Sequence, residues 1–322
     1  MKAAVVGAAG ATPTFTDFAD PTVHDGQRVV ELVAAGLHPV VRARISGRHY
    51  SSENVWPAVP GLDAVARTDD GRLIYTGMVA APWGTFAERF AVPSSFAVEL
   101  PDGVDPLAVA AGCNPGLASY VPLTNRRAAL GEAGLGTVLI LGATGIAGRI
   151  AVDNAFALGA TKVIAVGRNS EILRELADRR PDSVRTVTLT GTDDAAAIVA
   201  ALDDQAPTTV IDFVWGPVAE AAFTALDDPA LAGPHFDVAH IQIGAIAGAH
   251  AAVPATLLRS RRYAISGSGL GSVRPADMFG ALPAFIDQIA GGAVHIPFTA
   301  YPLAAIDEAW AASESTRAVV VP

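Results

Sequence analysis

The pattern of hydrophobic and polar positions divides the chain into three parts. Up to about residue 100, short apolar or alternating runs stand between Gly, Pro, Asp and Ser residues, which is typical of strands and turns in a small β-rich domain. From about residue 137, apolar runs of strand length alternate with helical periods. After residue 271, two helical segments precede a last β-branched run at 318–321. The pattern therefore predicts an α/β protein in which a parallel sheet is inserted into a β-rich domain.

The middle part predicts a doubly wound parallel sheet of six strands. Its apolar runs lack polar alternation, which indicates strands covered on both faces, and six is the number of strands in a full nucleotide-binding domain of this kind. One intervening helix is expected at 170–177, with Ser170 as its N-cap. The predicted strands are 138–141, 162–166, 184–189, 209–214, 239–243 and 263–266.

These elements predict the domain boundaries. Residues 1–116 form the first part of the β-rich domain, 117–270 form the doubly wound domain, and 271–322 complete the first domain. Two Ala- and Leu-rich helices, 106–111 and 116–130, lead from one to the other, and the tail at 318–321 is expected to pair with the N-terminal β unit.

Glycines at a spacing of three follow the first strand of the sheet and open a helix. Such glycines let the backbone turn sharply beside a pyrophosphate, and the helix N-terminus offers N–H groups and partial positive charge. The usual Gly-x-Gly-x-x-Gly is altered because Ala replaces its first Gly. A tight turn without a ligand is the alternative. The predicted dinucleotide contacts are Gly142, Ala143, Thr144, Gly145, Ile146, Ala147 and Gly148.

The end of the second strand indicates which dinucleotide binds. NAD sites usually place Asp or Glu there to hold the ribose 2′-hydroxyl. This chain has Gly167, Arg168 and Asn169 instead, and its next acid is Glu171. Because a guanidinium matches a 2′-phosphate, the sequence predicts NADP(H), with a solvated loop arginine as the alternative.

Composition and charge narrow the possible partners. Hydrophobic residues make up 51% and charged residues 17% of the 322 residues, so a large core is expected. The net charge of −10 argues against nucleic acid and anionic membranes. Cys113 is the only cysteine, and neither a signal peptide nor an 18-residue apolar run is present. We expect a soluble, cytoplasmic protein that acts on a small molecule.

Three motifs together resemble the medium-chain dehydrogenase/reductase family. Residues 60–66 read PGLDAVA, where the family has Pro-Gly-x-Asp/Glu. Residues 84–105, GTFAERFAVPSSFAVELPDGVD, resemble the segment that leads into its cofactor domain. GATGIAG at 142–148 resembles the glycine motif of the zinc-free quinone oxidoreductase branch. The resemblance implies a GroES-like catalytic domain, an inserted Rossmann domain, a homodimer, and hydride transfer between NADPH and a carbonyl or conjugated C=C bond.

The resemblance also bears on metal and cofactor contacts. Zinc-dependent relatives have a Cys near position 42 and a His directly after Pro-Gly, where this chain has Arg42 and Leu62. Catalytic zinc needs about three converging ligands, and a four-cysteine structural site needs more than one Cys, so no metal is expected. The resemblance implies backbone contacts to the nicotinamide half of the cofactor from Val214, Gly244, Ala245, Gly267 and Ser268.

Without zinc, a hydrogen-bond donor has to polarise the substrate oxygen. Tyr50 is the leading candidate because residues 46–52 resemble the substrate-binding loop of zinc-free relatives, and His49 is the alternative acid. An aromatic side chain that only packs against the protein is the alternative for Tyr50. Asn114 borders the nicotinamide pocket by resemblance, with a helix N-cap as the alternative. Cys113 is more typical of a buried hydrophobe, and Asp212 of a hydrogen-bonded carboxylate at a strand end.

The leading hypothesis is therefore an NADPH-dependent quinone or enone reductase. A zinc-free alcohol dehydrogenase or ketoreductase of a biosynthetic pathway is the second hypothesis, and a non-catalytic NADPH-binding sensor is the third. Fold-level resemblance does not choose among them.

Overall fold

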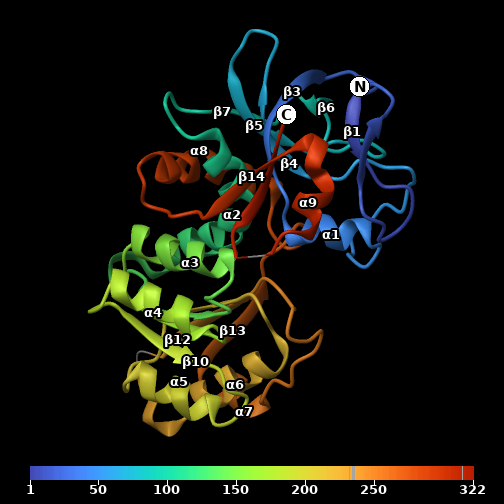
Figure 1. The fold of residues 1–322 in the computed structure, drawn as a ribbon. Helices are drawn as coiled ribbons and strands as arrows, with labels where there is room; N and C mark the ends of the chain where they lie inside the picture. Colours follow the sequence, from blue (N-terminus) through green and yellow to red (C-terminus); the bar gives the residue numbers. More distant parts are fainter. Residues whose placement is uncertain (232, 234–235, 314) are drawn as a thin grey trace. The chain divides into compact units, whose positions relative to one another are not determined.

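The structure, a computed structural model, describes residues 1–231, 233, 236–313 and 315–322. Within it the chain forms two compact units (Figure 1). The first unit consists of Met1–Pro115, Leu282–Gly292 and Ile296–Pro322, and the second of Gly116–Ala281 and Ala293–His295. The chain thus leaves the first unit and returns to it, and the two units are described separately below.

A seven-stranded sheet organises the first unit. Its strands follow the order β14-β15-β3-β4-β5-β7, and β6 pairs with β3. The last strand pairs antiparallel with β3, with Val319 opposite Gly36, which confirms that the C-terminal tail completes the N-terminal sheet. The strands of this sheet are β3 (Gln27–Gly36), β4 (Asp63–Arg67), β5 (Leu73–Gly77), β6 (Arg89–Pro93), β7 (Ala97–Glu99), β14 (Phe298–Pro302) and β15 (Arg317–Val321), and a separate pair consists of β1 (Lys2–Val5) and β2 (Thr14–Asp17).

The core of the first unit lies between these strands and two short helices, α1 (Pro39–Ile45) and α9 (Ile306–Ala311), the latter preceded by the 3-10 turn Leu303–Ala305. Phe86 and Phe90 are fully buried in it. Helix α1 was not predicted, because it has only seven residues and no side-chain N-cap. Its Pro39 occupies the first turn, where a missing N–H costs no helical hydrogen bond.

The two helices predicted at 106–111 and 116–130 are one helix, α2 (Pro106–Leu130), followed by the 3-10 turn Gly131–Ala133. It runs through Pro115 and Pro122, so the predicted break was wrong. Each proline removes only one backbone donor from a long helix. The Ala118 carbonyl, four residues before Pro122, accepts a hydrogen bond from the Ser268 hydroxyl at 3.4 Å instead.

The second unit contains the six-stranded parallel sheet that the sequence predicted. Its strand order, β10-β9-β8-β11-β12-β13, reverses direction beside β8, as in a Rossmann domain. Helices α3 and α4 cover one face, and α5, α6 and α7 the other (Figure 1). The strands are β8 (Gly136–Leu141), β9 (Ala160–Gly167), β10 (Val184–Thr188), β11 (Thr209–Asp212), β12 (Asp237–Gln242) and β13 (Arg262–Gly267).

The helices of the second unit close its core, which contains Leu139, Ile164 and Phe223 at 0% exposure. The segment Pro229–Leu231 adds a 3-10 turn. Helix α8 (Pro275–Ala290) begins in this unit and ends in the first. The other helices are α3 (Ile146–Ala157), α4 (Ser170–Arg179), α5 (Asp194–Leu202), α6 (Gly216–Leu226) and α7 (Ala255–Ser260).

Candidate cofactor and substrate sites

The strand register of the second unit aligns the predicted cofactor residues along one sheet edge. Leu141 pairs with Val166 and with Asp212, Asp212 pairs with Gln242, and Gln242 pairs with Gly267. Parallel strands end together at their carboxyl edge, where ligands of such sheets bind. The predicted contact residues all lie at or just after these strand ends, namely 142–148, 167–169, 214, 244–245 and 267–268.

The structure gives a different reason for glycine at each of the three positions in the turn. Gly142 has a φ of +87°, which a side chain would strain. A Cβ on Gly148 would lie 2.2 Å from the Gly142 carbonyl oxygen, so this glycine lets α3 pack against the turn. Gly145 is exposed, and a Cβ there would make only an ordinary 3.6 Å contact. Protein packing therefore explains Gly142 and Gly148, whereas the space beside Gly145 is open.

The N-terminus of α3 is ready to bind an anion. Gly145 is its N-cap and supplies no side-chain hydrogen bond, and no acidic residue stands in the first turn. The N–H groups of the first turn of a helix have no helical partners and lie at the positive end of its dipole. This fits the pyrophosphate of a dinucleotide.

Arg168 lies at the end of β9, exposed and without a hydrogen bond or ion pair to any described residue. The adjacent Asn169 caps α4, because its Oδ1 accepts from the N–H groups of Glu171 at 3.1 Å and Ile172 at 3.2 Å. The prediction that Ser170 is this N-cap was therefore wrong by one residue. A guanidinium without a protein partner is available for a phosphate.

Asp212 holds the turn that follows β11. Its Oδ1 accepts from the N–H groups of Val214 and Trp215, both at 2.8 Å, and Trp215 has a φ of +56°. Its Oδ2 lies 3.0 Å from His240 Nε2 on β12, and His240 Nδ1 contacts the Tyr263 hydroxyl on β13. Because Asp212 Oδ2 is the acceptor, His240 donates through Nε2, and its Nδ1 accepts a hydrogen bond from the Tyr263 hydroxyl. Burial raises the pKa of Tyr263 and keeps this hydroxyl protonated.

This network places Val214 directly beside the glycine turn. A Cβ on Gly142 would lie 2.7 Å from Val214 Cγ1, and the Val214 carbonyl accepts from Ala247 N–H at 2.8 Å. The remaining predicted contacts, Gly244, Ala245, Gly267 and Ser268, follow β12 or end β13. Gly244 N–H donates to the Asp212 carbonyl and Ser268 N–H to the Gln242 carbonyl.

In the first unit, His49 and Tyr50 lie in the loop after α1. Tyr50 is 74% exposed, and its ring centroid lies 4.2 Å from that of His49. His49 Nδ1 accepts from Ser51 N–H at 3.2 Å and lies 2.8 Å from the Ser51 hydroxyl. Desolvation and the nearby charge of Arg44 lower the pKa of His49, which disfavours its protonated form.

Asn114 lies inside α2, so the helix N-cap alternative was wrong. Its amide donates to Asp63 Oδ1 at 3.2 Å, and Tyr75 donates to Asp63 Oδ2 at 2.8 Å. His38 Nε2 lies 3.5 Å from the same Oδ2, and neither ring nitrogen makes a hydrogen bond to any described residue. The sequence analysis missed this buried cluster because its members come from four elements or their ends, although Asp63 stood in the PGLDAVA motif.

Burial decides the protonation states around Asp63. It lowers the pKa of His38, which the Asp63 carboxylate only partly opposes, and it raises the pKa values of Tyr75 and Cys113. At neutral pH the histidine is therefore neutral, and the phenol and the thiol keep their protons. The buried Cys113 thiol is thus a weak nucleophile.

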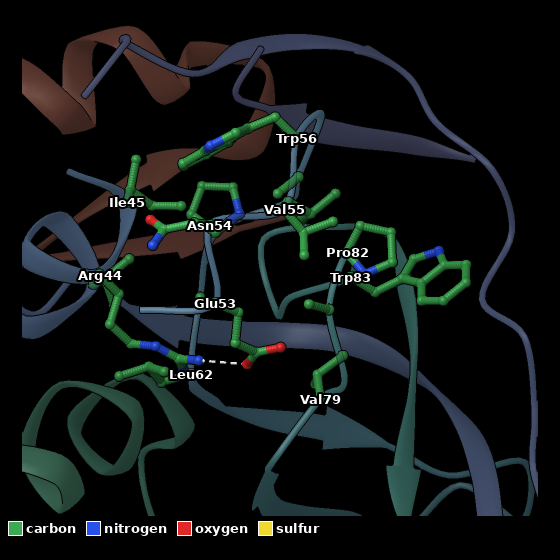
Figure 2. Close-up of a pocket in the computed structure, with 16 residues that line it drawn as sticks. Arg44, Ile45, Glu53, Asn54, Val55, Trp56, Leu62, Val79, Pro82 and Trp83 are labelled. Carbon is green, nitrogen blue, oxygen red and sulfur yellow. Dashed lines mark hydrogen bonds and ion pairs between the residues drawn. The ribbon is translucent and has the colours of Figure 1, made fainter. Parts of the chain in front are cut away.

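A pocket opens in the first unit beside α1 (Figure 2). It is a shallow hollow with a cavity volume of about 70 Å³, which is well below the range of small-molecule sites. Neither His49 nor Tyr50 is among the described residues that line it. Its walls are mostly apolar, with one ion pair between Arg44 Nη2 and Glu53 Oε1 at 2.8 Å. The other lining residues are Val41, Ile45, 54–56, 58–62, Val79 and 81–83.

Arg42 and Leu62, which stand where zinc-dependent relatives have zinc ligands, make other contacts. Arg42 Nη2 donates to the Trp310 carbonyl at 2.9 Å, and its guanidinium lies 5.7 Å from the Trp310 ring centroid. Leu62 lines the pocket. Among the described residues, no three His, Cys, Asp or Glu side chains are grouped to hold a metal ion. The absence of a metal stays a prediction.

Comparisons with known proteins bear on the family. No family model matches the chain. The probable NADPH-dependent quinone reductase tdiC of Emericella nidulans is 25% identical over an alignment of 352 residues that covers 96% of each chain. The chain is thus similar in sequence, over nearly its full length, to a probable quinone reductase. This confirms the predicted resemblance to the zinc-free quinone oxidoreductase branch of the medium-chain dehydrogenase/reductase family.

Solved structures confirm the predicted fold of the chain. The quinone oxidoreductase of Thermus thermophilus superposes with a TM-score of 0.79 at 24% identity and full coverage of both chains. A 2-haloacrylate reductase gives a TM-score of 0.80 at 18% identity, with 100% of this chain and 99% of that chain covered. The GroES-like and Rossmann architecture predicted from the sequence is thus confirmed.

Proposed function

We propose that this protein is an NADPH-dependent oxidoreductase that reduces a quinone or an α,β-unsaturated carbonyl compound without a metal ion. The observation that carries the proposal is the uncapped, glycine-lined N-terminus of α3 at the same sheet edge as the unpaired Arg168. The name of the relative tdiC supports the same cofactor and substrate class. NADPH, when bound, supplies the hydride.

The residues of the second unit fit this cofactor. The first-turn N–H groups of Ile146, Ala147 and Gly148 bind the pyrophosphate, and Gly145 leaves room for its approach. Arg168 binds the 2′-phosphate, which an uncharged or acidic residue there would not. The turn fixed by Asp212 presents Val214 to the nicotinamide half, together with the backbone of Gly244, Ala245, Gly267 and Ser268, while Gly167 and Asn169 flank the ribose.

For the first unit we propose that the Tyr50 hydroxyl donates to the substrate oxygen. Its exposure leaves the hydroxyl accessible, and His49 beside it is the alternative donor. A lowered pKa makes His49 a less abundant acid at neutral pH, which favours Tyr50. The side-chain NH₂ group of Asn114 donates to Asp63, and this leaves the Asn114 Oδ1 to bind the carboxamide of the cofactor.

We also propose that residues 1–116 with 271–322 act as the catalytic domain and 117–270 as the cofactor domain of a cytoplasmic homodimer. The family resemblance and the return of β15 to the first sheet support this division. None of the described helices has the length and hydrophobicity to cross a membrane.

The test begins with titration of the protein with NADPH and NADH, followed by addition of 2-methyl-1,4-naphthoquinone or 2-cyclohexen-1-one. Tight NADPH binding and its oxidation on adding either acceptor are expected. Reduction of simple ketones alone would favour the ketoreductase hypothesis. Binding without oxidation by any acceptor would refute the enzymatic proposal.

Replacement of the unpaired arginine tests the cofactor assignment. Arg168→Ala should weaken NADPH binding by about 30-fold, because a charge-assisted contact to the 2′-phosphate is lost, and should leave NADH binding within about twofold. Isothermal titration calorimetry measures both affinities. Arg127→Ala, at an exposed position on α2, is the matched control. An equal loss for the two cofactors would rule out the 2′-phosphate role.

A further inference from the structure

The turn after β11 has a backbone conformation that its own residues do not favour. Trp215 has a φ of +56° and a ψ of −159°, a region that bulky side chains rarely adopt. Such a conformation persists only where the surrounding structure holds it. The Asp212 carboxylate does so, because its Oδ1 accepts from the N–H groups of Val214 and Trp215, both at 2.8 Å.

The Asp212 carboxylate is held in turn by two neighbouring strands. His240 Nε2, on β12, lies 3.0 Å from Asp212 Oδ2. The Tyr263 hydroxyl, on β13, donates to His240 Nδ1, so the ring N–H of the histidine stands at Nε2 and faces the carboxylate. The His240 ring also packs edge-on against the Trp215 indole, with the two ring centroids 5.9 Å apart. His240 therefore supports the turn both through Asp212 and by direct contact.

The supported turn forms part of the candidate cofactor site. Val214 covers the glycine turn, since its Cγ1 lies 2.7 Å from the position of a Cβ on Gly142. The Val214 carbonyl accepts from the Ala247 N–H at 2.8 Å and so also fixes the loop that follows β12. A change in the orientation of Asp212 would thus shift the side chain of Val214 and this loop together.

The strand order separates the two ends of a bound dinucleotide. β9, which ends beside Arg168, and β11, which precedes Val214, flank β8 on opposite sides. The glycine turn follows β8 and lies between them. A dinucleotide that lies across this edge, with its 2′-phosphate at Arg168, therefore has its nicotinamide half on the side of β11, β12 and β13.

We propose that His240 and Tyr263 are positioning residues for the nicotinamide half of the cofactor. The inference rests on the proposed function and extends it to two residues that the sequence analysis did not single out. Their side chains are 0% and 6% exposed, so they act through Asp212 and the turn that it holds and do not touch the cofactor. Loss of either side chain leaves the carboxylate less well fixed and lets the strained turn relax.

Comparison of the whole cofactor with its adenosine half tests this inference. Tyr263→Phe removes one hydroxyl and keeps the aromatic ring, so it should weaken NADPH binding about fivefold, the effect of one hydrogen bond. Binding of adenosine 2′,5′-bisphosphate, which lacks the nicotinamide half, should stay within about twofold. Isothermal titration calorimetry measures both ligands. Unchanged NADPH binding, or an equal loss for the two ligands, would overturn the proposal.

Two replacements of His240 test whether its hydrogen bond to Asp212 does the positioning. The amide of His240→Gln can still donate to Asp212 Oδ2, whereas His240→Leu has no donor. NADPH binding should therefore weaken about 20-fold in His240→Leu and be largely restored in His240→Gln. Equal weakening in both variants would contradict a role for the hydrogen bond. If His240→Leu does not fold, Tyr263→Phe with its milder change decides the matter.

A control at the opposite edge of the sheet separates positioning from general destabilisation. Thr208 directly precedes β11, and its hydroxyl donates to the Leu135 carbonyl. Thr208→Val should lower the urea midpoint of unfolding, as Tyr263→Phe does, and leave NADPH binding unchanged. If Thr208→Val weakened NADPH binding as much as Tyr263→Phe, the effect would reflect lost stability and the positioning role would fall.

The two proposals fail in different ways. If the wild type binds NADPH and the variants show the expected loss, but no acceptor is ever reduced, the proposed function fails and the positioning role stands. If the wild type and Tyr263→Phe bind and oxidise NADPH equally well, the function stands and the positioning role is wrong.

Discussion

Each unit buries one aspartate beside one histidine, and the two pairs differ in how completely they are hydrogen-bonded. In the second unit His240 lies 3.0 Å from Asp212 and also contacts the Tyr263 hydroxyl, so both of its ring nitrogens have partners. In the first unit His38 lies 3.5 Å from Asp63, and within the described part of the chain neither ring nitrogen makes a hydrogen bond.

The architecture explains this difference. Asp212, His240 and Tyr263 stand on three adjacent parallel strands, whose register brings side chains of one face to similar heights. The groups around Asp63 come from β4, β5, α2 and the residue before α1, and no common register aligns them. Regular neighbouring strands thus complete a polar network more readily than elements meeting from several directions.

Replacement of each aspartate should give the largest effects and tests whether the two sites differ in their contribution to stability. Asp212→Ala should cost about 4 kcal/mol in the free energy of unfolding, because it strands two backbone N–H groups and His240. Asp63→Ala should cost about 2 kcal/mol, because it removes the partner of one buried hydroxyl and one partly buried amide but of no backbone N–H group. Urea denaturation measures both, with the exposed Asp178→Ala as the control. Equal losses at the two sites would remove the distinction.

Replacement of the histidines should have smaller, unequal effects. His240→Leu should cost about 3 kcal/mol, because the Tyr263 hydroxyl and Asp212 Oδ2 each lose a buried partner. His38→Leu should cost less than about 1 kcal/mol, since the side chain it removes makes no hydrogen bond. The same denaturation experiment tests the order. A larger loss for His38 would show that its contact with Asp63 is strong despite the 3.5 Å separation.

The last expected effect is a gradual dependence of stability on pH. Because burial lowers the pKa of His38 from its ordinary value of 6.5, the unfolded chain binds more protons than the folded chain just below that pH. Stability should therefore decline as the pH falls below about 6.5, by at most about 1.4 kcal/mol per pH unit for this group. Unfolding between pH 5 and 8 measures the slope, which His38→Leu should reduce. An identical slope in that variant would assign the effect to other groups.

The sequence also predicted the second unit more completely than the first. All six strands of the second unit were predicted, because a strand buried on both faces is an uninterrupted apolar run. In the first unit α1 was missed, because it is short and has no side-chain N-cap. The pocket was missed with α1, because Arg44 lies on that helix.

The sequence by itself determined the doubly wound sheet, the glycine turn and the position of Arg168 directly after a strand. Each of these depends on neighbouring residues in the chain, such as an apolar run, a spacing of glycines, or the residue that ends a strand. Only the tertiary structure decided that Asn169 caps α4, that α2 continues through Pro115, and that Asp212 joins His240 and Tyr263. The tertiary structure also decided which residues line the pocket together with Arg44. The physical reason is that hydrogen-bond partners and pocket walls come from residues distant in sequence, whose meeting depends on packing and not on local pattern.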